Sequence, residues 1–505
     1  MNAITFENVS KYYASTEVQA SDNVSFSIRK GEIHAICGEN GAGKSTLMNI
    51  LFGLERMDSG RILINEKEVE IRNASDALGY GIGMVHQHFK LVSSFTVAQS
   101  ILLGTEDKMF ISKKQEEDAV GRLAEAYSLP IDPCALIDTL PVGMLQRVEI
   151  LKMLIRNVDI LILDEPTAVL TPNEVGPFLD TLRNLKDKGK TIIFISHKLQ
   201  EVLDASDRIT VMRKGRVIGT KDAKDTTMEE LADMMVGRKV LFSVEKKEAD
   251  RGEVVLDVEH LDLTAPSGLK VLKDVSFSIR RGEIYGIAGV SGNGQEALVR
   301  AIAGNMDVSS GKIRILNKEV QNLSVQKKRD AGLAYVPEDR IHVGLNMDAT
   351  LEDNSILGYE NDKEFRKGPF LDEDKIRKRS LQMIKDYQIH GASVDGLVSK
   401  LSGGNMQKVV LAREFAHNPD LLIVDQPVRG LDVGSIEFVH KAIIKERDRG
   451  AAVLLVSVEL DEILSLSDRV GVMYSGSLVG ELEGKDINEK NIALLMVGKR
   501  GGEIR

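Results

Sequence analysis

An internal repeat constrains the fold of this chain more than any other feature. The segment NVSFSIRKGEIHAI, which begins at Asn23, recurs as DVSFSIRRGEIYGI from Asp274. LILDEP from Leu161 recurs as LIVDQP from Leu422, so the segments follow one another in the same order in both halves. One long repeat that occurs twice indicates two homologous domains, because arrays of short repeats have periods of 20 to 50 residues.

A short charged segment separates the two copies. SVEKKEADRGE, from Ser243 to Glu253, has no apolar periodicity, which is typical of a connection between domains. We therefore predict one domain over residues 1–243 and a second over residues 254–505. The chain carries a net charge of −10, which argues weakly against a nucleic-acid partner, because such partners usually need a basic face. Its apolar runs are shorter than the ~20 residues needed to cross a bilayer, so we expect no membrane span.

A glycine-rich loop in the first half predicts a phosphate site. CGENGAGKST has a glycine, four residues and then Gly-Lys-Ser, which is the spacing of a P-loop. Glycines let backbone N–H groups surround phosphate oxygens, Lys44 supplies a positive charge, and the Ser45 hydroxyl can ligate Mg²⁺. An apolar strand over 32–37 and a helix over about 44–53 would flank the loop, with the positive helix end at the anion. The candidate nucleotide-binding residues of the loop are Gly38, Glu39, Asn40, Gly41, Ala42, Gly43, Lys44, Ser45 and Thr46.

Each half then shows the pattern of an α/β domain. An antiparallel β opening leads into the strand, loop and helix just described. A helical middle follows, at 113–129 in the first half and 373–389 in the second, where apolar residues recur with helical spacing. Short apolar strands alternate with helices after that, as in a parallel sheet covered on both faces.

Polar residues at the ends of apolar strands supply the candidate chemistry. DILILDEP ends in Asp164, suited to hold Mg²⁺, and in Glu165, suited to polarise the attacking water. Gln87 and His197 also end apolar strands and could meet the metal, the water or the terminal phosphate. Each of these residues alone would be an ordinary polar residue at the end of a strand. The catalytic interpretation therefore depends on the P-loop upstream. Ser45, Gln87 and Asp164 are thus the candidate metal ligands.

The second half contributes a different anion-binding turn. LSGGN, from Leu401 to Asn405, precedes a helix predicted over about 406–417. Ser402 and the N–H groups of Gly403 and Gly404 would present a polar surface at the positive end of that helix. In isolation, such a segment would be an ordinary N-cap.

Together these segments resemble the ATP-binding cassette (ABC) family over essentially all of both halves. In that family two cassettes pack head to tail, so each ATP lies between one cassette's P-loop and the other's signature turn. The resemblance implies two tandem P-loop NTPase domains, each an α/β mixed-sheet core with a helical subdomain and an antiparallel β subdomain. It implies one ATP site built from the loop residues above with Gln87, Asp164, Glu165 and His197, closed by Ser402, Gly403, Gly404, Asn405 and the D-loop Asp432. Tyr13 is a candidate for adenine stacking, although an ordinary surface tyrosine is the open alternative.

The second site that this pairing implies departs from the family pattern at nearly every position. An amide replaces the general-base carboxylate and cannot accept a proton, and proline replaces the signature serine. The departures are Gln295 and Glu296 for Lys-Ser, Gln426 for Glu, Val458 for His, Glu338 for Gln, and Pro141 in the opposing LPVGM. Intact and altered parts segregate by composite site, which head-to-tail pairing predicts.

More specifically, the chain resembles the tandem ATP-binding subunits of bacterial importers for monosaccharides and nucleosides. The markers are YVPEDR, LSGGNMQKVVLARE and RGLDVG in the second half. IGMVHQHFKL, from Ile82, and GVSGNGQEAL, from Gly289, are closer to the nucleoside branch, while sugars and other small polar metabolites such as vitamins stay open as cargo. The alternative is a soluble tandem-cassette ATPase that acts on ribosomes or DNA.

This resemblance implies a set of partners. ATP and Mg²⁺ would be bound, and ATP hydrolysis would be coupled to solute import. Two separate membrane permease subunits would contact the chain, and an extracytoplasmic solute-binding (lipo)protein would act through them. The chain would touch neither the solute nor nucleic acid, and it would lie peripherally on the cytoplasmic face of the membrane. The stretch YVPEDR has no role in this scheme beyond contact with a permease or the other cassette.

Overall fold

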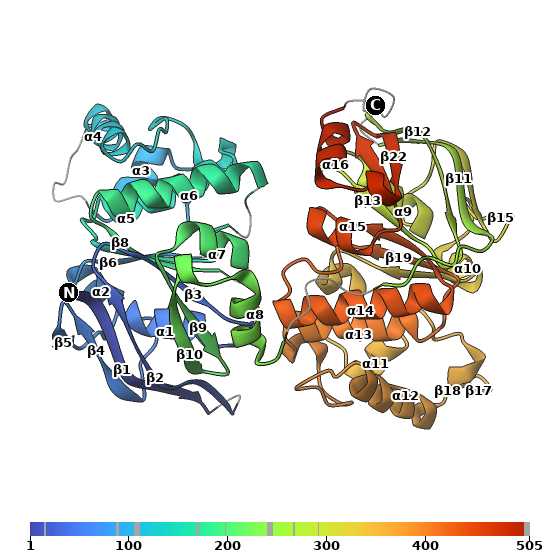
Figure 1. Ribbon diagram of the computed structural model, residues 1–505, viewed down its shortest axis with the longest axis horizontal. Helices are drawn as coiled ribbons and strands as arrows, with labels where there is room; N and C mark the ends of the chain where they lie inside the picture. The colour runs from blue at the N-terminus through green and yellow to red at the C-terminus, as the bar shows by residue number, and fades with distance from the viewer. Residues whose placement is uncertain are drawn as a thin grey trace. The chain divides into compact units, whose positions relative to one another are not determined.

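The chain folds into two units of the same architecture (Figure 1). A computed structural model describes residues 1–14, 17–86, 90–105, 112–167, 170, 172–196, 198–239, 246–265, 268–290 and 292–498. One unit spans residues 1–240 with 432–434, and the other spans residues 241–431 with 435–505. Each unit holds a four-stranded antiparallel sheet and a six-stranded mixed sheet.

In the first unit, the mixed sheet has the order β10-β9-β3-β8-β7-β6, and all its pairs are parallel except β9 with β10. The antiparallel sheet has the order β2-β1-β4-β5. Every residue of β3, β7 and β8 is buried, as expected of parallel strands covered on both faces. The strands are β1 (Asn2–Tyr13), β2 (Val18–Arg29), β3 (Ile33–Cys37), β4 (Ser59–Ile64), β5 (Lys67–Val69), β6 (Ile82–Val85), β7 (Ile160–Asp164), β8 (Thr191–Ile195), β9 (Arg208–Arg213) and β10 (Arg216–Asp222).

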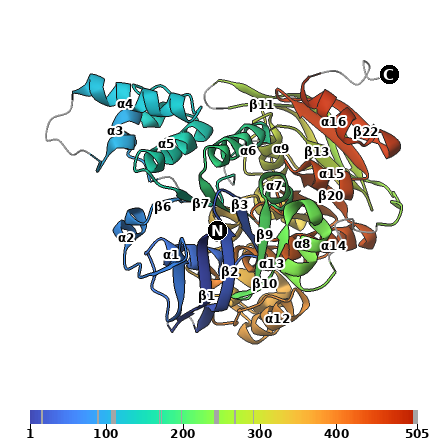
Figure 2. The same ribbon diagram turned by 60° about the vertical axis from the view of Figure 1, so that its left-hand side comes forward.

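Three helices of the first unit lie together, apart from its antiparallel strands. Figures 1 and 2 show α3, α4 and α5 gathered at one end of this unit, away from β1 and β2. Within this group, α4 corresponds to the helix predicted over 113–129. The helices are α1 (Lys44–Leu51), α2 (Ala74–Gly79), α3 (Val97–Leu102), α4 (Lys113–Ala126), α5 (Val142–Leu154), α6 (Pro172–Asp187), α7 (Leu199–Ala205) and α8 (Met228–Val236), with the short turns η1 (Ile137–Thr139) and η2 (Ala223–Asp225).

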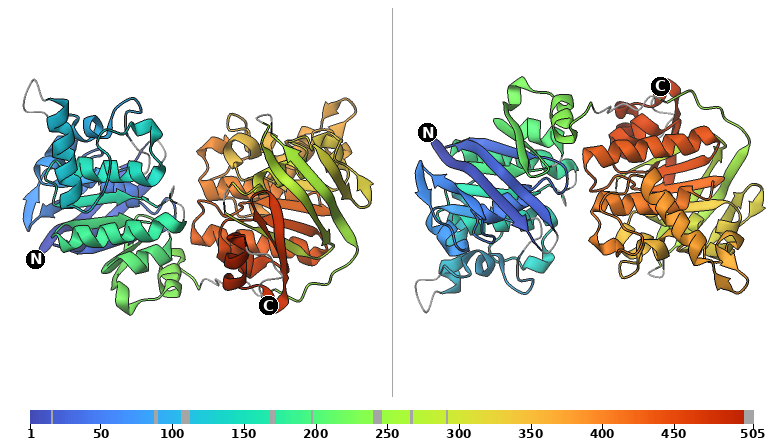
Figure 3. Two further views of the ribbon diagram at one scale, coloured as in Figure 1. Left: turned by 90° about the horizontal axis from the view of Figure 1, so that it is seen from above. Right: turned by 90° about the horizontal axis from the view of Figure 1, so that it is seen from below.

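The second unit repeats this plan, with its mixed sheet in the order β16-β19-β20-β13-β21-β22 and its antiparallel sheet in the order β12-β11-β14-β15. In Figure 3 the long strands β11 and β12, yellow-green, run along one face of this unit. The strands are β11 (Val254–Thr264), β12 (Lys270–Arg280), β13 (Ile284–Ala288), β14 (Ser310–Ile315), β15 (Lys318–Glu319), β16 (Leu333–Val336), β17 (Arg366–Lys367), β18 (Phe370–Leu371), β19 (Leu421–Asp425), β20 (Ala452–Val456), β21 (Arg469–Tyr474) and β22 (Ser477–Glu483).

The helices of the second half correspond to those of the first, with additional short elements between them. They are α9 (Gln295–Ala303), α10 (Val325–Asp330), α11 (Leu351–Ser355), α12 (Glu373–Asp386), α13 (Gly403–Phe415), α14 (Val433–Arg449), α15 (Leu460–Leu466) and α16 (Glu489–Met496), with the π-helical turn η3 (Arg340–Gly344) and the short turns η4 (Lys363–Phe365), η5 (Val398–Lys400) and η6 (Gly484–Asp486). The predicted helix over about 406–417 was placed too late, because α13 begins at Gly403, directly after its N-cap Ser402.

These sheets and helices confirm the predicted α/β class with a mixed-sheet core, a helical group and an antiparallel β sheet in each unit. In the part of the chain that the structure describes, no helix is both long enough and apolar enough to span a membrane.

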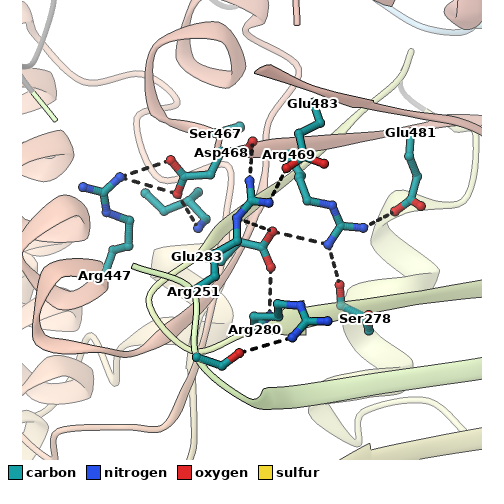
Figure 4. A network of polar contacts seen from close by, with 12 residues as sticks. Arg251, Ser278, Arg280, Glu283, Arg447, Ser467, Asp468, Arg469, Glu481 and Glu483 are labelled. Carbon is teal, nitrogen blue, oxygen red and sulfur yellow. Dashed lines mark hydrogen bonds and ion pairs between the residues drawn. The ribbon is translucent and has the colours of Figure 1, made fainter. Parts of the chain in front are cut away.

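The charged seam between the repeats is anchored on the second unit. Lys246 Nζ lies 3.0 Å from Asp468 Oδ1, and Arg251 Nε lies 3.4 Å from Glu283 Oε1. Glu283 is fully buried and the Asp468 side chain nearly so, and each of the two cations offsets the cost of removing its own partner carboxylate from water. Each carboxylate also meets one arginine from elsewhere in the unit (Figure 4). The seam therefore contributes to the packing of the second unit from residue 246 onward.

Candidate active site

The P-loop follows β3 and is shaped by two close backbone approaches. A Cβ added at Gly38 would lie 2.3 Å from the Met212 carbonyl oxygen of β9, and one added at Gly43 would lie 2.0 Å from that of Ala20 in β2. Both positions therefore admit only glycine. Gly41 and Gly43 also have φ of 82° and 97°, in the left-handed region that glycine adopts at little cost. The loop thus fits between two strands and leads directly into α1.

Lys44, the first residue of α1, folds back over the loop. Its Nζ donates to the carbonyl oxygens of Gly38, at 2.7 Å, and of Glu39, at 3.0 Å. The side chain is 6% exposed. Burial lowers the pKa of Lys44, and the charge of Glu165 partly opposes that shift. A buried cation that donates to neutral carbonyls is well placed to exchange them for the oxygens of a polyphosphate.

The predicted carboxylate pair lies beside the loop. The Ser45 hydroxyl donates to Asp164 Oδ1 at 3.4 Å, although 119 positions separate the two residues. Burial raises the pKa of Asp164, the bond from Ser45 lowers it, and Glu165 raises it further. Hydroxyl and carboxylate oxygens are ligands that Mg²⁺ accepts, usually with waters and phosphate oxygens completing the shell. The two side chains therefore fit the ion that the sequence predicts.

Glu165 has a backbone conformation that few non-glycine residues adopt. Its φ is 47°, and its N–H donates to the Ile195 carbonyl oxygen at the end of β8, at 3.0 Å. Strained positions of this kind cluster at functional sites, where the surrounding structure fixes them. Here the neighbouring strand β8 fixes the turn that carries the candidate general base.

One positioning residue was missed by the sequence reasoning. Gln146, in α5, is 1% exposed, and its Nε2 donates to the Pro166 carbonyl oxygen at 2.8 Å. This bond connects α5, which begins within LPVGM, to the turn after Asp164 and Glu165. The repeat carried a signal for it, because Gln407 occupies the same place after LSGGN in the second half.

Two predicted site residues, Gln87 and His197, lie outside the described residues. The strands that lead to them are described: β6 ends at Val85, which pairs with Leu163, and β8 ends at Ile195, which pairs with Ile36 and Asp164. The carboxyl ends of β3, β6, β7 and β8 therefore meet at one edge of the sheet, where ligands of such sheets usually bind.

The structure also describes the surroundings of Tyr13 and of further residues of the loop. Ala42 is buried in the core, whereas Asn40 and Ser45 are exposed residues. Tyr13 is half-buried at the end of β1, with Lys11 Nζ 5.4 Å from its ring centroid. Adenine stacking by Tyr13 stays a prediction.

The signature turn in the second unit is held by its own side chains. Ser402 is the N-cap of α13, and its Oγ accepts from Asn405 Nδ2 at 3.0 Å. The Asn405 side chain also accepts from the N–H of His390 at 3.0 Å, so a loop outside the helix braces the turn. The corresponding α5 in the first unit begins after Pro141 and has no side-chain cap. Asp432 directly precedes α14.

The second phosphate loop keeps the backbone and replaces the chemistry. A Cβ at Gly289 would lie 2.8 Å from the Met473 carbonyl oxygen, as at Gly38 in the first unit. Gln295 Nε2 donates to the Val290 carbonyl oxygen at 3.2 Å, in the place of the Lys44 bonds. Burial and the charge of Glu296 raise the pKa of Asp425 to about 7. This loop therefore closes on an uncharged amide and offers no cation to phosphate.

Comparison with known proteins agrees with this geometry. The family profile described as ABC transporter matches residues 21–168 and 272–429. A nucleoside import ATP-binding protein of Lactococcus lactis subsp. cremoris is 46% identical over 481 residues, 95% of each chain. A guanosine import ATP-binding protein of Bacillus subtilis is 45% identical over 483 residues, again 95% of each chain. A glucose import ATP-binding protein of Haloferax volcanii is 40% identical over 532 residues, 99% of this chain and 96% of that one.

The chain therefore belongs to the ABC transporter family. Within that family it is an ATP-binding subunit of the importing kind, and its reaction is the hydrolysis of ATP coupled to import. These findings confirm the predicted family, fold class and ATPase activity.

Proposed function

We propose that this ATPase powers the uptake of a nucleoside through one competent ATP site. The observation that carries the proposal is the segregation of intact and altered parts. The first half holds the Lys-Ser loop and Glu165, the second half holds the LSGGN turn, and their counterparts Gln295, Gln426 and Pro141 are altered. In this proposal the loop of the first half and the signature of the second close on the same ATP, with domains over 1–243 and 254–505.

The residues of the first half divide the hydrolysis among them. Lys44 holds the β- and γ-phosphates, and Glu165 orients a water and accepts its proton as the water oxygen bonds to the γ-phosphorus and the bond to ADP breaks. Gln87 and His197 would assist at the water and the γ-phosphate. Mg²⁺, held by Ser45, Asp164 and Gln87, would neutralise phosphate charge. Phosphoryl transfer depends mainly on such positioning and charge stabilisation.

The test of the competent site is a matched pair of substitutions at corresponding turns. Glu165→Gln removes the proton acceptor, and turnover should fall by about 100-fold or more while nucleotide still binds. Gln426→Ala alters the same turn of the second half, and turnover should stay within about two-fold. Steady-state ATPase activity of the full chain measures both. Full activity in Glu165→Gln would overturn the assignment, and a large loss in Gln426→Ala would give the second site a role.

A second pair tests whether the signature acts on the loop of the other half. Ser402→Arg places a bulky cation in the intact turn, and we expect turnover to be lost while Lys44-dependent ATP binding survives. Pro141→Arg makes the same change in the altered turn and serves as the control, with turnover preserved. Equal effects of the two changes on turnover would refute head-to-tail closure.

We propose two permease subunits and an extracytoplasmic solute-binding (lipo)protein as partners, with the chain peripheral at the cytoplasmic face of the membrane. Nucleoside cargo is favoured by the two relatives at 45% and 46% identity, whereas the glucose relative at 40% keeps sugars as the alternative. A gentle detergent pull-down of the tagged chain from its native cells tests this. Multi-span membrane proteins and a binding protein would support it, and the ligand of that binding protein would name the cargo. Ribosomal or DNA-repair proteins with no membrane partner would overturn it.

A further inference from the structure

The YVPEDR stretch of the second half, residues 335–340, runs from the end of β16 to the first residue of η3, and each of its charged side chains has a partner within the second unit. Asp339 caps the turn η3, accepting from the N–H groups of Ile341, at 3.0 Å, and His342, at 2.9 Å. This cap fixes the direction in which the chain leaves β16. It thereby orients the two residues beside it, Glu338 and Arg340.

Arg340 reaches from this turn to two other segments at once. Its Nη1 donates to the Arg429 carbonyl oxygen at 3.0 Å. Its Nη2 lies against the signature turn, because a Cβ added at Gly403 would be only 2.9 Å away from it. Its Nε is buried and has no hydrogen-bond partner among the described residues. A guanidinium so placed is held by contact with the two segments, and glycine at 403 is what allows the approach.

Glu338 contacts the same segment, at the side chain of Arg429. Its carboxylate forms an ion pair with the Arg429 guanidinium. The Arg429 side chain is 66% exposed, so this ion pair by itself contributes little energy. The ion pair adds a second contact to Arg429. Glu338 pairs with the side chain of Arg429, and Arg340 donates to its backbone carbonyl. We call these three residues the bracket.

The first half cannot form this arrangement. It has Gln87 where the second half has Glu338, Ala168 where it has Arg429, and Val142 where it has Gly403. The bracket therefore occurs in the half with the intact LSGGN turn. Arg340 also adds positive charge near the N-terminus of α13, where an anion is needed to offset it.

We propose that the bracket is a positioning device for ATP hydrolysis. It connects the chain that leaves β16 to two segments, the signature turn at Gly403 and the segment from Arg429 to Asp432. The three segments are thereby kept in one fixed geometry. In this way Glu338, which has lost the role of a metal-binding glutamine, serves the ATP bound by the P-loop of the first half. The inference rests on the proposed composite site.

The principal test is Arg340→Ala in the full chain, with nucleotide binding and turnover measured separately. We expect kcat to fall about ten-fold, because misplacing positioning groups by a fraction of an ångström slows the reaction. KM for ATP and the affinity for a fluorescent ATP analogue should stay within about two-fold, since the P-loop is unchanged. Arg340→Lys should recover part of kcat, because an ammonium can still donate to the Arg429 carbonyl. Arg366→Ala is the matched control, since Arg366 Nε also donates to a carbonyl, that of Glu360, outside the bracket.

A double-mutant cycle gives a second measurement that does not depend on Arg340. Glu338→Gln and Arg429→Gln should each lower kcat about three-fold, and the double variant should be no slower than either, because both remove the same contact. Fully additive losses, or a raised KM with unchanged kcat, would overturn the bracket. If Glu165→Gln abolishes turnover while Arg340→Ala and the cycle leave it unchanged, the bracket alone is wrong. If Glu165→Gln keeps full turnover, the proposed function itself fails.

Discussion

The two phosphate loops of this chain have nearly the same backbone conformation, but one carries a cationic side chain where the other carries an uncharged one. Gly43 and Gly294 precede their helices with φ of 97° and 105°. Lys44 follows in the first loop, and Gln295 follows in the second. Each side chain donates to backbone carbonyls of its own loop. The loop conformation therefore depends on packing and on one side-chain hydrogen-bond donor, which can be Lys or Gln. The positive charge of the lysine is needed only to bind phosphate.

The turns after the central strands give the same lesson. Glu165 and Gln426 have φ of 47° and 49°, and each N–H donates to the end of the neighbouring strand. In the second unit, Gln426 Oε1 also accepts from the N–H of Val458, at 3.2 Å. An amide that cannot accept a proton from water thus takes part in a purely structural bond. The second unit keeps a strained turn because the sheet imposes it.

The substitution with the largest expected effect is Lys44→Gln, which gives the first loop the side chain of the second. It tests whether the charge of Lys44 is what distinguishes the two loops. We expect ATP affinity and turnover to fall by about 100-fold, because an uncharged amide loses the charge-assisted bonds to the phosphates. Titration with a fluorescent ATP analogue and steady-state ATPase assays measure the two losses. The reciprocal Gln295→Lys should add no turnover, since Gln426 still lacks a proton acceptor. Affinity within about three-fold of the original chain would show that the charge difference does not separate the loops.

An intermediate effect concerns the buried Asp425, whose pKa is about 7 against an ordinary value of 3.8. Because the folded chain holds this proton more tightly than the unfolded chain, stability falls as pH rises from about 4 to about 7, and the penalty is complete above that. Asp425→Asn should therefore stabilise the second unit by up to about 4 kcal/mol at pH 8 and hardly at pH 4.

Calorimetric unfolding of the full chain at the two pH values measures this difference. Asp164→Asn is the control in the first unit, where loss of the carboxylate should instead abolish turnover. A stabilisation by Asp425→Asn that is equal at both pH values would show that the ionised carboxylate is not its cause.

The smallest expected effect concerns the seam between the repeats, which contacts the second unit. Lys246→Ala and Arg251→Ala each remove one cation from a buried carboxylate that keeps another partner, so each should destabilise the second unit by about 1 kcal/mol. Chemical denaturation followed by a probe in each unit measures this. Lys239→Ala, which changes a lysine before the seam in the first unit, is the control. Equal loss in both units, or none, would contradict the anchoring of the seam on the second unit alone.

The sequence by itself determined the two homologous units, the loop around Lys44, the pair Asp164 and Glu165, and the asymmetry between the halves. These features are local or repeat at long intervals, so residue type and spacing reveal them directly. The helix after LSGGN was predicted, but its start was not, because the glycines at 403 and 404 favour no helix until the Ser402 cap is formed.

Only the tertiary structure decided which distant atoms meet. Gln146 reaches Pro166, Arg340 lies against Gly403, and Lys246 binds Asp468, across separations of 20 to more than 200 positions. No spacing rule in the sequence predicts such pairs, because they follow from the packing of whole helices and strands around the core. The motifs specify which chemistry is available in each half, whereas packing decides which residues hold it in place.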